Sequence, residues 1–199
     1  KTVEIIKNYF GKVPAKKAPK IKLFKENRKN KRPRVKLSKR EVNQVNLILG
    51  FRFANARHKD WVVGKLIENL FSGGMSTRLF QEIRDKRGLV YHIIGQYTSF
   101  KDYGLFEVYA GTKKKNMDKV KRLILKEFEK LRKEPVTERE LKTIKELMEG
   151  RFLMEDEQNM QTSIVLATHE IIESVDKYTA FVKDLKRIKS GDIKRVANK

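Results

Sequence analysis

The stretch of sequence that decides the fold runs from Phe71 to Tyr91 and reads FSGGMSTRLFQEIRDKRGLVY. We expect Gly73-Gly74 to end a preceding helix, because glycine takes the left-handed conformation of a helix C-cap without steric cost. Ser76 or Thr77 can then begin a new helix by accepting a hydrogen bond from a backbone N–H. Gly88 ends that second helix. The stretch therefore predicts a short helix held between two glycine turns.

A cation and a phenol lie on either side of the second glycine turn. The apolar residues within 79–83 recur at helical spacing and give the short helix one apolar side. The run 89–94 is rich in β-branched and aromatic residues, which predicts a strand. Arg84 then lies in the last turn of the helix, and Tyr91 lies just inside the strand. A guanidinium and a phenol hydroxyl placed in this way could hold a carbonyl oxygen or a carboxylate.

Period-two alternation and helical periodicity predict the rest of the architecture. Residues 44–53 read as the first strand, and 60–71 as a helix. Strands at 91–100 and 103–112, joined by two residues, predict an antiparallel hairpin. Everything after Lys113 reads as helical, with helices expected at 117–132, 141–156, 159–174, 177–188 and 192–199. Strands first and helices later predict an α+β fold, an antiparallel sheet with helices packed on one face.

The segment GGMSTRLFQEIRDKRGLVY closely resembles the C-terminal half of the pitrilysin (insulinase) zinc metallopeptidases, in the bacterial branch similar to mitochondrial processing peptidase. The shared pattern is a glycine-rich turn, a helix start of serine, arginine, leucine and phenylalanine, and an arginine seven residues before a tyrosine. Ser72 departs from it, because the family often has a third glycine there. A weaker likeness covers nearly the whole chain and includes Tyr9-Phe10-Gly11, Gly191-Asp192-Ile193 and Val196-Ala197.

This resemblance implies a domain organisation and a set of roles. It implies that 1–10 is the tail helix of a preceding domain and that 41–199 is the substrate-binding domain, which is half of a two-domain processing-peptidase-like unit. The composition of 11–40, which is basic with three prolines and few large apolar residues, predicts a linker that could hold an extended piece at 21–24. Arg84 and Tyr91 would project into the chamber and hold substrate near the scissile bond, opposite the zinc. Gly73 and Gly74 would lie near the chamber and take part in substrate entry. From the residues alone, Arg84 could instead satisfy carbonyls at a helix end, Tyr91 could be a strand tyrosine half in the core, and the two glycines could be only a helix stop.

The composition argues against thiolate metal sites, a nucleic-acid surface and a membrane span. The chain has 199 residues, a formal net charge of +22 and no cysteine, so no thiolate metal site or disulfide framework can form. Residues 1–40 hold 16 Lys or Arg against two acidic residues, a net of +14. Most of the positive charge thus precedes the expected fold, which is typical of a solvated linker rather than a nucleic-acid surface. No apolar run approaches the length of a membrane span.

The histidines do not form a zinc motif. None of His58, His92 and His169 begins a His-x-x-Glu-His sequence, which would supply two ligands and a general-base glutamate on one helix. His169-Glu170-Ile171-Ile172-Glu173 resembles the forward motif but has glutamate in place of the second histidine. We therefore expect no metal ligands in this chain, and expect the zinc of the complete enzyme to be held by an N-terminal half or a partner subunit. We also expect Arg78 and Arg87 to be solvated charges.

The sequence thus predicts the C-terminal half of a zinc-dependent endopeptidase, which binds a peptide or unfolded protein and stabilises the transition state of hydrolysis. One alternative is a catalytically inactive family member that serves as a structural or peptide-binding subunit. A His-x-x-Glu-His motif upstream of Lys1 or in a neighbouring reading frame would distinguish the two. A second alternative, a basic nucleic-acid-binding module, is supported only by charge, and a salt-dependent shift of DNA or RNA by residues 41–199 would favour it. The compartment stays open between cytoplasm and periplasm.

Overall fold

A computed structural model of the chain describes residues 1–14, 16, 22, 33–38, 43–157 and 159–199. Most of the segment expected to be a basic linker, with its possible extended piece at 21–24, lies outside the described residues. The strands are β1 (Val45–Phe53), β2 (Val90–Ser99) and β3 (Gly104–Thr112). The helices are α1 (Thr2–Phe10), α2 (Trp61–Ser72), η1 (Phe80–Asp85), η2 (Lys114–Asn116), α3 (Met117–Lys133), α4 (Glu138–Asp156), α5 (Asn159–Ile172), α6 (Asp176–Thr179), α7 (Phe181–Arg187) and α8 (Ser190–Ala197).

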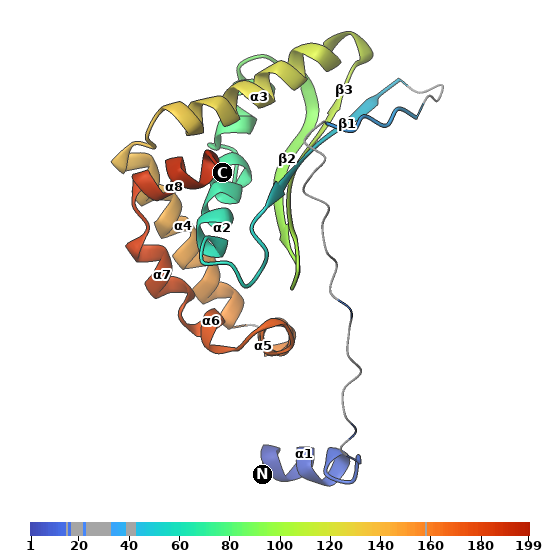
Figure 1. Ribbon diagram of the computed structural model, residues 1–199, viewed down its shortest axis with the longest axis vertical. Coiled ribbons are helices and arrows are strands. Elements are labelled where there is room, and N and C mark those ends of the chain that lie inside the picture. The colour runs from blue at the N-terminus through green and yellow to red at the C-terminus, as the bar shows by residue number, and fades with distance from the viewer. Residues whose placement is uncertain (15, 17–21, 23–32, 39–42, 158) are drawn as a thin grey trace.

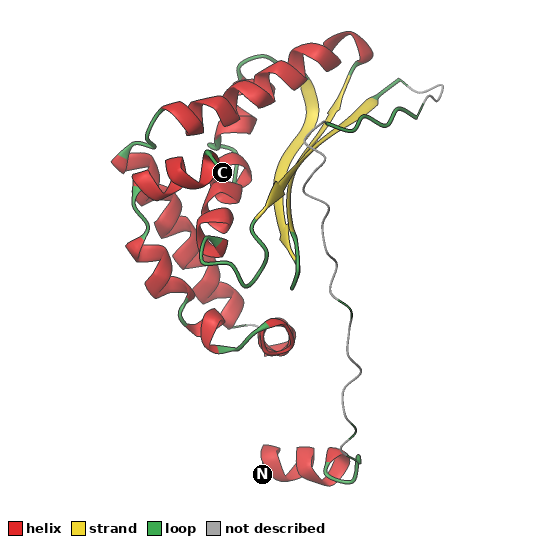
Figure 2. Cartoon of the chain, in the orientation of Figure 1, coloured by secondary structure: helices red, strands yellow, loops and turns green. Residues whose placement is uncertain are grey.

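The sheet confirms the predicted α+β class. Its three strands lie in the order β1-β3-β2, and both pairings are antiparallel. Helices cover one face of the sheet, whereas α1 lies apart from the other elements (Figures 1 and 2). Along β1 the side chains alternate between partly buried and exposed, as the period-two pattern predicted. None of the helices in the described part of the chain is long and apolar enough to cross a membrane.

The core lies between the sheet and the helical layer. Phe71 of α2, Phe106 of β3 and Phe128 of α3 meet there, with ring centroids 4.7 to 5.9 Å apart. Aromatic groups of this size supply much of the apolar surface that folding buries. Gly64 lets α2 approach the sheet, because a Cβ at that position would lie 2.5 Å from the ring of Tyr97.

One face of α2 also covers the outer edge of β2. Trp61, Lys65, Glu68 and Ser72 follow one another at the spacing of a single helix face. Ser72 accepts a hydrogen bond from the backbone N–H of Gly95. Glu68 accepts from the N–H of Tyr97 at 3.1 Å, Lys65 donates to its carbonyl at 3.1 Å, and Trp61 donates to the hydroxyl of Ser99 at 2.9 Å.

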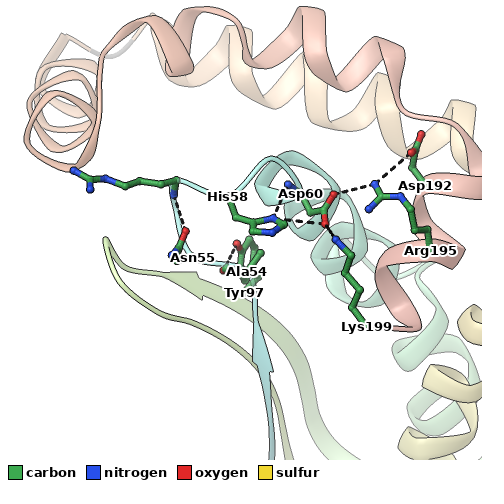
Figure 3. A network of polar contacts seen from close by, with 9 residues as sticks. Ala54, Asn55, His58, Asp60, Tyr97, Asp192, Arg195 and Lys199 are labelled. Carbon is green, nitrogen blue, oxygen red and sulfur yellow. Dashed lines mark hydrogen bonds and ion pairs between the residues drawn. The ribbon is translucent and has the colours of Figure 1, made fainter. Parts of the chain in front are cut away.

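The buried carboxylate of Asp60 holds the C-terminal end of the chain against the start of α2 (Figure 3). Asp60 precedes α2, and its side chain is only 3% exposed. Arg195 of α8 lies 2.9 Å from one carboxylate oxygen, and Lys199 donates to the other. Burial alone would raise the pKa of Asp60, but the hydrogen bonds and charges of Arg195 and Lys199 outweigh burial and lower that pKa to about 2.

Two details of the helical layer differ from the sequence prediction. The helix expected over 177–188 is divided into α6 and α7 at Ala180. The spacing of Thr137 and Glu140 also predicts a capping box at the start of α4. Thr137 accepts the N–H of Glu140, but the Glu140 carboxylate does not complete the box. It pairs instead with Arg78, whose guanidinium donates two hydrogen bonds of 2.7 and 2.6 Å. The prediction that Arg78 is a solvated charge is therefore wrong, because this side chain is only 20% exposed.

Candidate functional site

The first glycine turn ends α2, but not by the expected geometry. Gly73 has φ −70° and ψ 0°, a right-handed conformation, so the left-handed cap predicted there is wrong. Glycine is still required sterically, since a Cβ would lie 2.6 Å from the carbonyl oxygen of Asn69. Gly74 follows with a nearly extended φ of 159°. These two glycines turn the chain out of α2 and into the short helix.

The short helix contains a π-helical turn. Thr77 begins it by donating its hydroxyl to the carbonyl of Gly74 at 2.6 Å, rather than by accepting an N–H as predicted. The backbone from Phe80 to Asp85 is π-helical, and the N–H of Lys86 reaches the carbonyl of Gln81 at 3.0 Å. Such turns are rare and are frequently found at functional sites. The sequence periodicity cannot distinguish a π turn from an α turn over so few residues.

Gly88 forms the second turn as predicted. Its φ of +56° lies in the left-handed region. Its N–H donates to the carbonyl of Arg84 at 2.9 Å, and the next N–H, of Leu89, donates to Ile83 at 3.1 Å. This pair of bonds closes the helix end and directs the chain into β2.

A β-bulge turns Tyr91 outward at the start of β2. Val90 pairs with Thr112 and His92 pairs with Gly111, so Tyr91 is the extra residue between the two pairs. Ile93 is buried, and regular alternation would place Tyr91 on the same buried face. The bulge breaks that alternation, and the Tyr91 side chain is 53% exposed.

Arg84 is also exposed, at the end of the π-helical turn. Its guanidinium carbon lies 4.9 Å from the centroid of the Phe80 ring, a cation–π contact that leaves the N–H groups open. Within the described part of the chain, neither the Arg84 guanidinium nor the Tyr91 hydroxyl makes a hydrogen bond. The structure brings the two residues to the same end of β2, joined through Gly88, without linking them to each other. Both groups can therefore donate to a ligand that carries oxygen acceptors.

Sequence reasoning missed the residue that holds the glycine turn. Arg151 of α4 donates one hydrogen bond to the carbonyl of Gly73 and another, of 3.1 Å, to the side chain of Asn69. A cation at the C-terminus of α2 also complements the helix dipole. Arg151 is 78 positions from Gly73, and no local pattern in the sequence signals the pairing. Arg87, in contrast, stays at the surface and pairs with Glu82 at 2.9 Å.

A cavity of about 370 Å³ lies beside the glycine turn, between α2, the edge of β2 and the helices α4 to α7. His169 lines it and contacts Trp61 and Tyr178, with ring centroids 5.5 Å apart in both cases. Burial, aided by the positive charge of Lys177, lowers the pKa of His169, so its imidazole is neutral at pH 7. His169 thus faces an aromatic cavity.

The described residues do not fit a zinc site. No three His, Cys, Asp or Glu side chains among them lie close enough together to hold a metal ion. A catalytic zinc takes three protein ligands and leaves one position open to water. No zinc ligand can therefore be assigned among the described side chains.

Comparison with known proteins identifies the class of fold. A protease from Helicobacter pylori superposes with a TM-score of 0.77 at 25% identity, over 80% of this chain and 39% of that one. The inactive peptidase domain of a putative zinc protease from Bordetella parapertussis superposes with a TM-score of 0.70 at 16% identity, over 81% of this chain and 88% of that one. The fold is thus that of a peptidase domain.

Sequence comparison identifies the family. Residues 1–148 match the family described as the peptidase M16 inactive domain, and the chain belongs to that family. An uncharacterized zinc protease of Bacillus subtilis, YmxG, is 27% identical over 144 residues, which is 69% of this chain and 35% of that protein. An uncharacterized zinc protease of Streptomyces coelicolor, SCO5738, is 36% identical over 109 residues, 54% of this chain and 24% of that protein. The resemblance to the pitrilysin family is confirmed, and these matches span about a quarter to a third of the curated relatives' length.

Proposed function

We propose that this chain is the substrate-holding half of a zinc-dependent endopeptidase, in which Arg84 and Tyr91 bind the peptide at the bond to be cleaved. The observation that carries this proposal is the bulge at the start of β2. It exposes a phenol hydroxyl that has no hydrogen-bond partner among the described residues. β-bulges commonly occur next to active sites, where they change the direction of one side chain.

The two groups suit the charge that develops during peptide hydrolysis. When water attacks a peptide carbonyl, negative charge grows on the carbonyl oxygen, and a preorganised donor stabilises it. The Tyr91 hydroxyl is the donor placed to do this, and the Arg84 guanidinium holds the neighbouring peptide carbonyls. Zinc, held outside this chain in an N-terminal half or a partner subunit, would supply the activated water.

An extended peptide would not add as a strand along the middle of β2. The outward N–H groups of Gly95 and Tyr97 are already bonded to Ser72 and Glu68. The peptide would instead approach from the open side of the bulge, where Tyr91 and His92 are both exposed. Gly73 and Gly74 shape the chain next to this approach, which is the role we propose for them.

Steady-state kinetics of Tyr91→Phe in the complete enzyme test the proposal. The substitution keeps the ring and removes the hydroxyl, so the melting temperature should be unchanged. Loss of an oxyanion donor should lower kcat by about 10²–10³. A donor that binds only the ground state would instead raise KM and leave kcat unchanged. Parental kcat and KM in a normally folded variant would refute the role of Tyr91. Arg84→Lys, which keeps the charge but loses the planar fork, should raise KM.

A further inference from the structure

The cavity beside the glycine turn has walls that are already fixed. Phe152 of α4 stacks on Phe181 of α7 with centroids 5.3 Å apart, and Trp61 meets Phe181 edge-on at 5.8 Å. Tyr178 contacts Phe152 at 4.8 Å. These contacts hold the rings around an open volume of about 370 Å³, within the range of about 300–1,000 Å³ typical of ligand cavities. The cavity is therefore preformed and aromatic.

The charged groups of the cavity balance one another. Its lining contains two cations, Lys65 and Arg151, and two carboxylates, Glu68 and Glu155. The ammonium of Lys65 lies 3.0 Å from Glu68, and Arg151 bonds to the end of α2. An entering anion would have to compete with Glu68 for Lys65, or with Asn69 and the Gly73 carbonyl for Arg151. The neutral imidazole of His169 adds no charge, so a neutral, apolar group suits the cavity best.

The cavity adjoins the site proposed for the scissile bond. Ile94 and Gly95 of β2 line its edge, and Gly73 lines it from the glycine turn. Ile94 is three residues from Tyr91 along the same strand, a distance of about 10 Å at about 3.3 Å per residue. An extended peptide held at Tyr91 covers that distance in about three residues.

We propose that this cavity is a specificity subsite that takes an aromatic side chain of the peptide, about three residues from the bond held at Tyr91. The position of this subsite relative to the scissile bond rests on the proposed function. Binding to the cavity can be measured separately from catalysis, because Trp61 is the single tryptophan of the chain and lines the cavity.

The binding test uses the 199-residue chain and two blocked peptides, acetyl-Ala-Ala-Phe-Ala-Ala-amide and its all-alanine counterpart. Excited at 295 nm, Trp61 should report saturable binding of the phenylalanine peptide at a concentration about tenfold or more below that needed for the alanine peptide. Equal responses to both peptides, or none to either, would overturn the proposal.

Two matched variants locate the binding. Glu155→Phe places a ring at the cavity, whereas Glu146→Phe makes the same change on α4 away from it. Glu155→Phe should weaken binding of the phenylalanine peptide about tenfold, and Glu146→Phe should leave binding unchanged. Identical binding by both variants, each with a parental melting temperature, would place the peptide elsewhere and refute the subsite.

Kinetics of the complete enzyme separate this proposal from the proposed function. Substrates with phenylalanine or alanine at each position should show a preference in kcat/KM of about tenfold at one position. Glu155→Phe should abolish that preference, while Tyr91→Phe should lower kcat for both substrates and keep their ratio. A preference that survives Glu155→Phe refutes the subsite, and a Tyr91→Phe enzyme with parental rates refutes only the role of Tyr91.

Discussion

The buried carboxylate of Asp60 should make the stability of this domain depend on pH in acid. The folded state lowers its pKa from 3.8 to about 2. Each pKa unit corresponds to about 1.36 kcal/mol, so the charged group stabilises the fold by roughly 2 kcal/mol at pH 7. Since the folded pKa is the lower one, this contribution is complete above pH 3.8 and disappears as the pH falls through about 2.

Asp60→Asn removes the charge at every pH. At pH 7 the variant should lose roughly 2 kcal/mol of unfolding free energy, because Arg195 and Lys199 lose their partner and return to water. The gap between parent and variant should be roughly halved at pH 3 and close to zero below pH 2. Urea denaturation followed by Trp61 fluorescence at several pH values measures it.

Asp118→Asn is the matched control, since Asp118 is an exposed acid in the first turn of α3. Its unfolding free energy should stay within about 0.5 kcal/mol of the parent. A gap for Asp60→Asn that is equally large at pH 7 and pH 2 would refute the electrostatic argument, because packing alone would then explain the loss.

Three further outcomes are expected. Gly88→Ala should cost about 1–2 kcal/mol of unfolding free energy, because alanine is strained at a φ of +56°. An added Cβ would meet nothing within 4 Å, so the cost reports the backbone conformation alone, and an unchanged unfolding free energy would contradict the left-handed turn. Glu140→Gln should cost about 1–3 kcal/mol of unfolding free energy by breaking the pair with Arg78, whereas Glu138→Gln in the same turn of α4 should leave stability unchanged. Equal melting temperatures of the two variants would contradict a stabilising role for the pair. The chain alone should bind no stoichiometric zinc and cleave no fluorogenic peptide, and one zinc per chain in metal analysis of chelator-free protein would contradict this.

Local patterns in the sequence predicted the features that depend on neighbouring residues. The alternation of β1 and the turn at Gly88 follow from backbone geometry within a few positions, and both are confirmed. The exposure of Arg84 and Tyr91 agrees with the roles that the family resemblance implied, although those roles stay a prediction.

The remaining features depend on contacts between distant segments. The bulge that exposes Tyr91 is set by the register of β2 against β3, which alternation within one strand does not specify. Arg78 meets Glu140 across 62 positions, and Arg151 meets Gly73 across 78. The cavity exists only because α4 to α7 come together over the edge of β2.

Side chains of α2 form hydrogen bonds with one part of β2, so the two parts of this strand should differ in how readily they open. From Gly95 to Ser99 the strand is bonded to β3 on one side and to side chains of α2 on the other, so opening there must disrupt α2 as well. Between Tyr91 and Ile93 the strand starts at a bulge, and among the described residues it is bonded to β3 alone. Local fluctuations of Tyr91, which the proposed binding of a peptide would use, can therefore occur without loosening the core, since α2 anchors the strand from Gly95 onward.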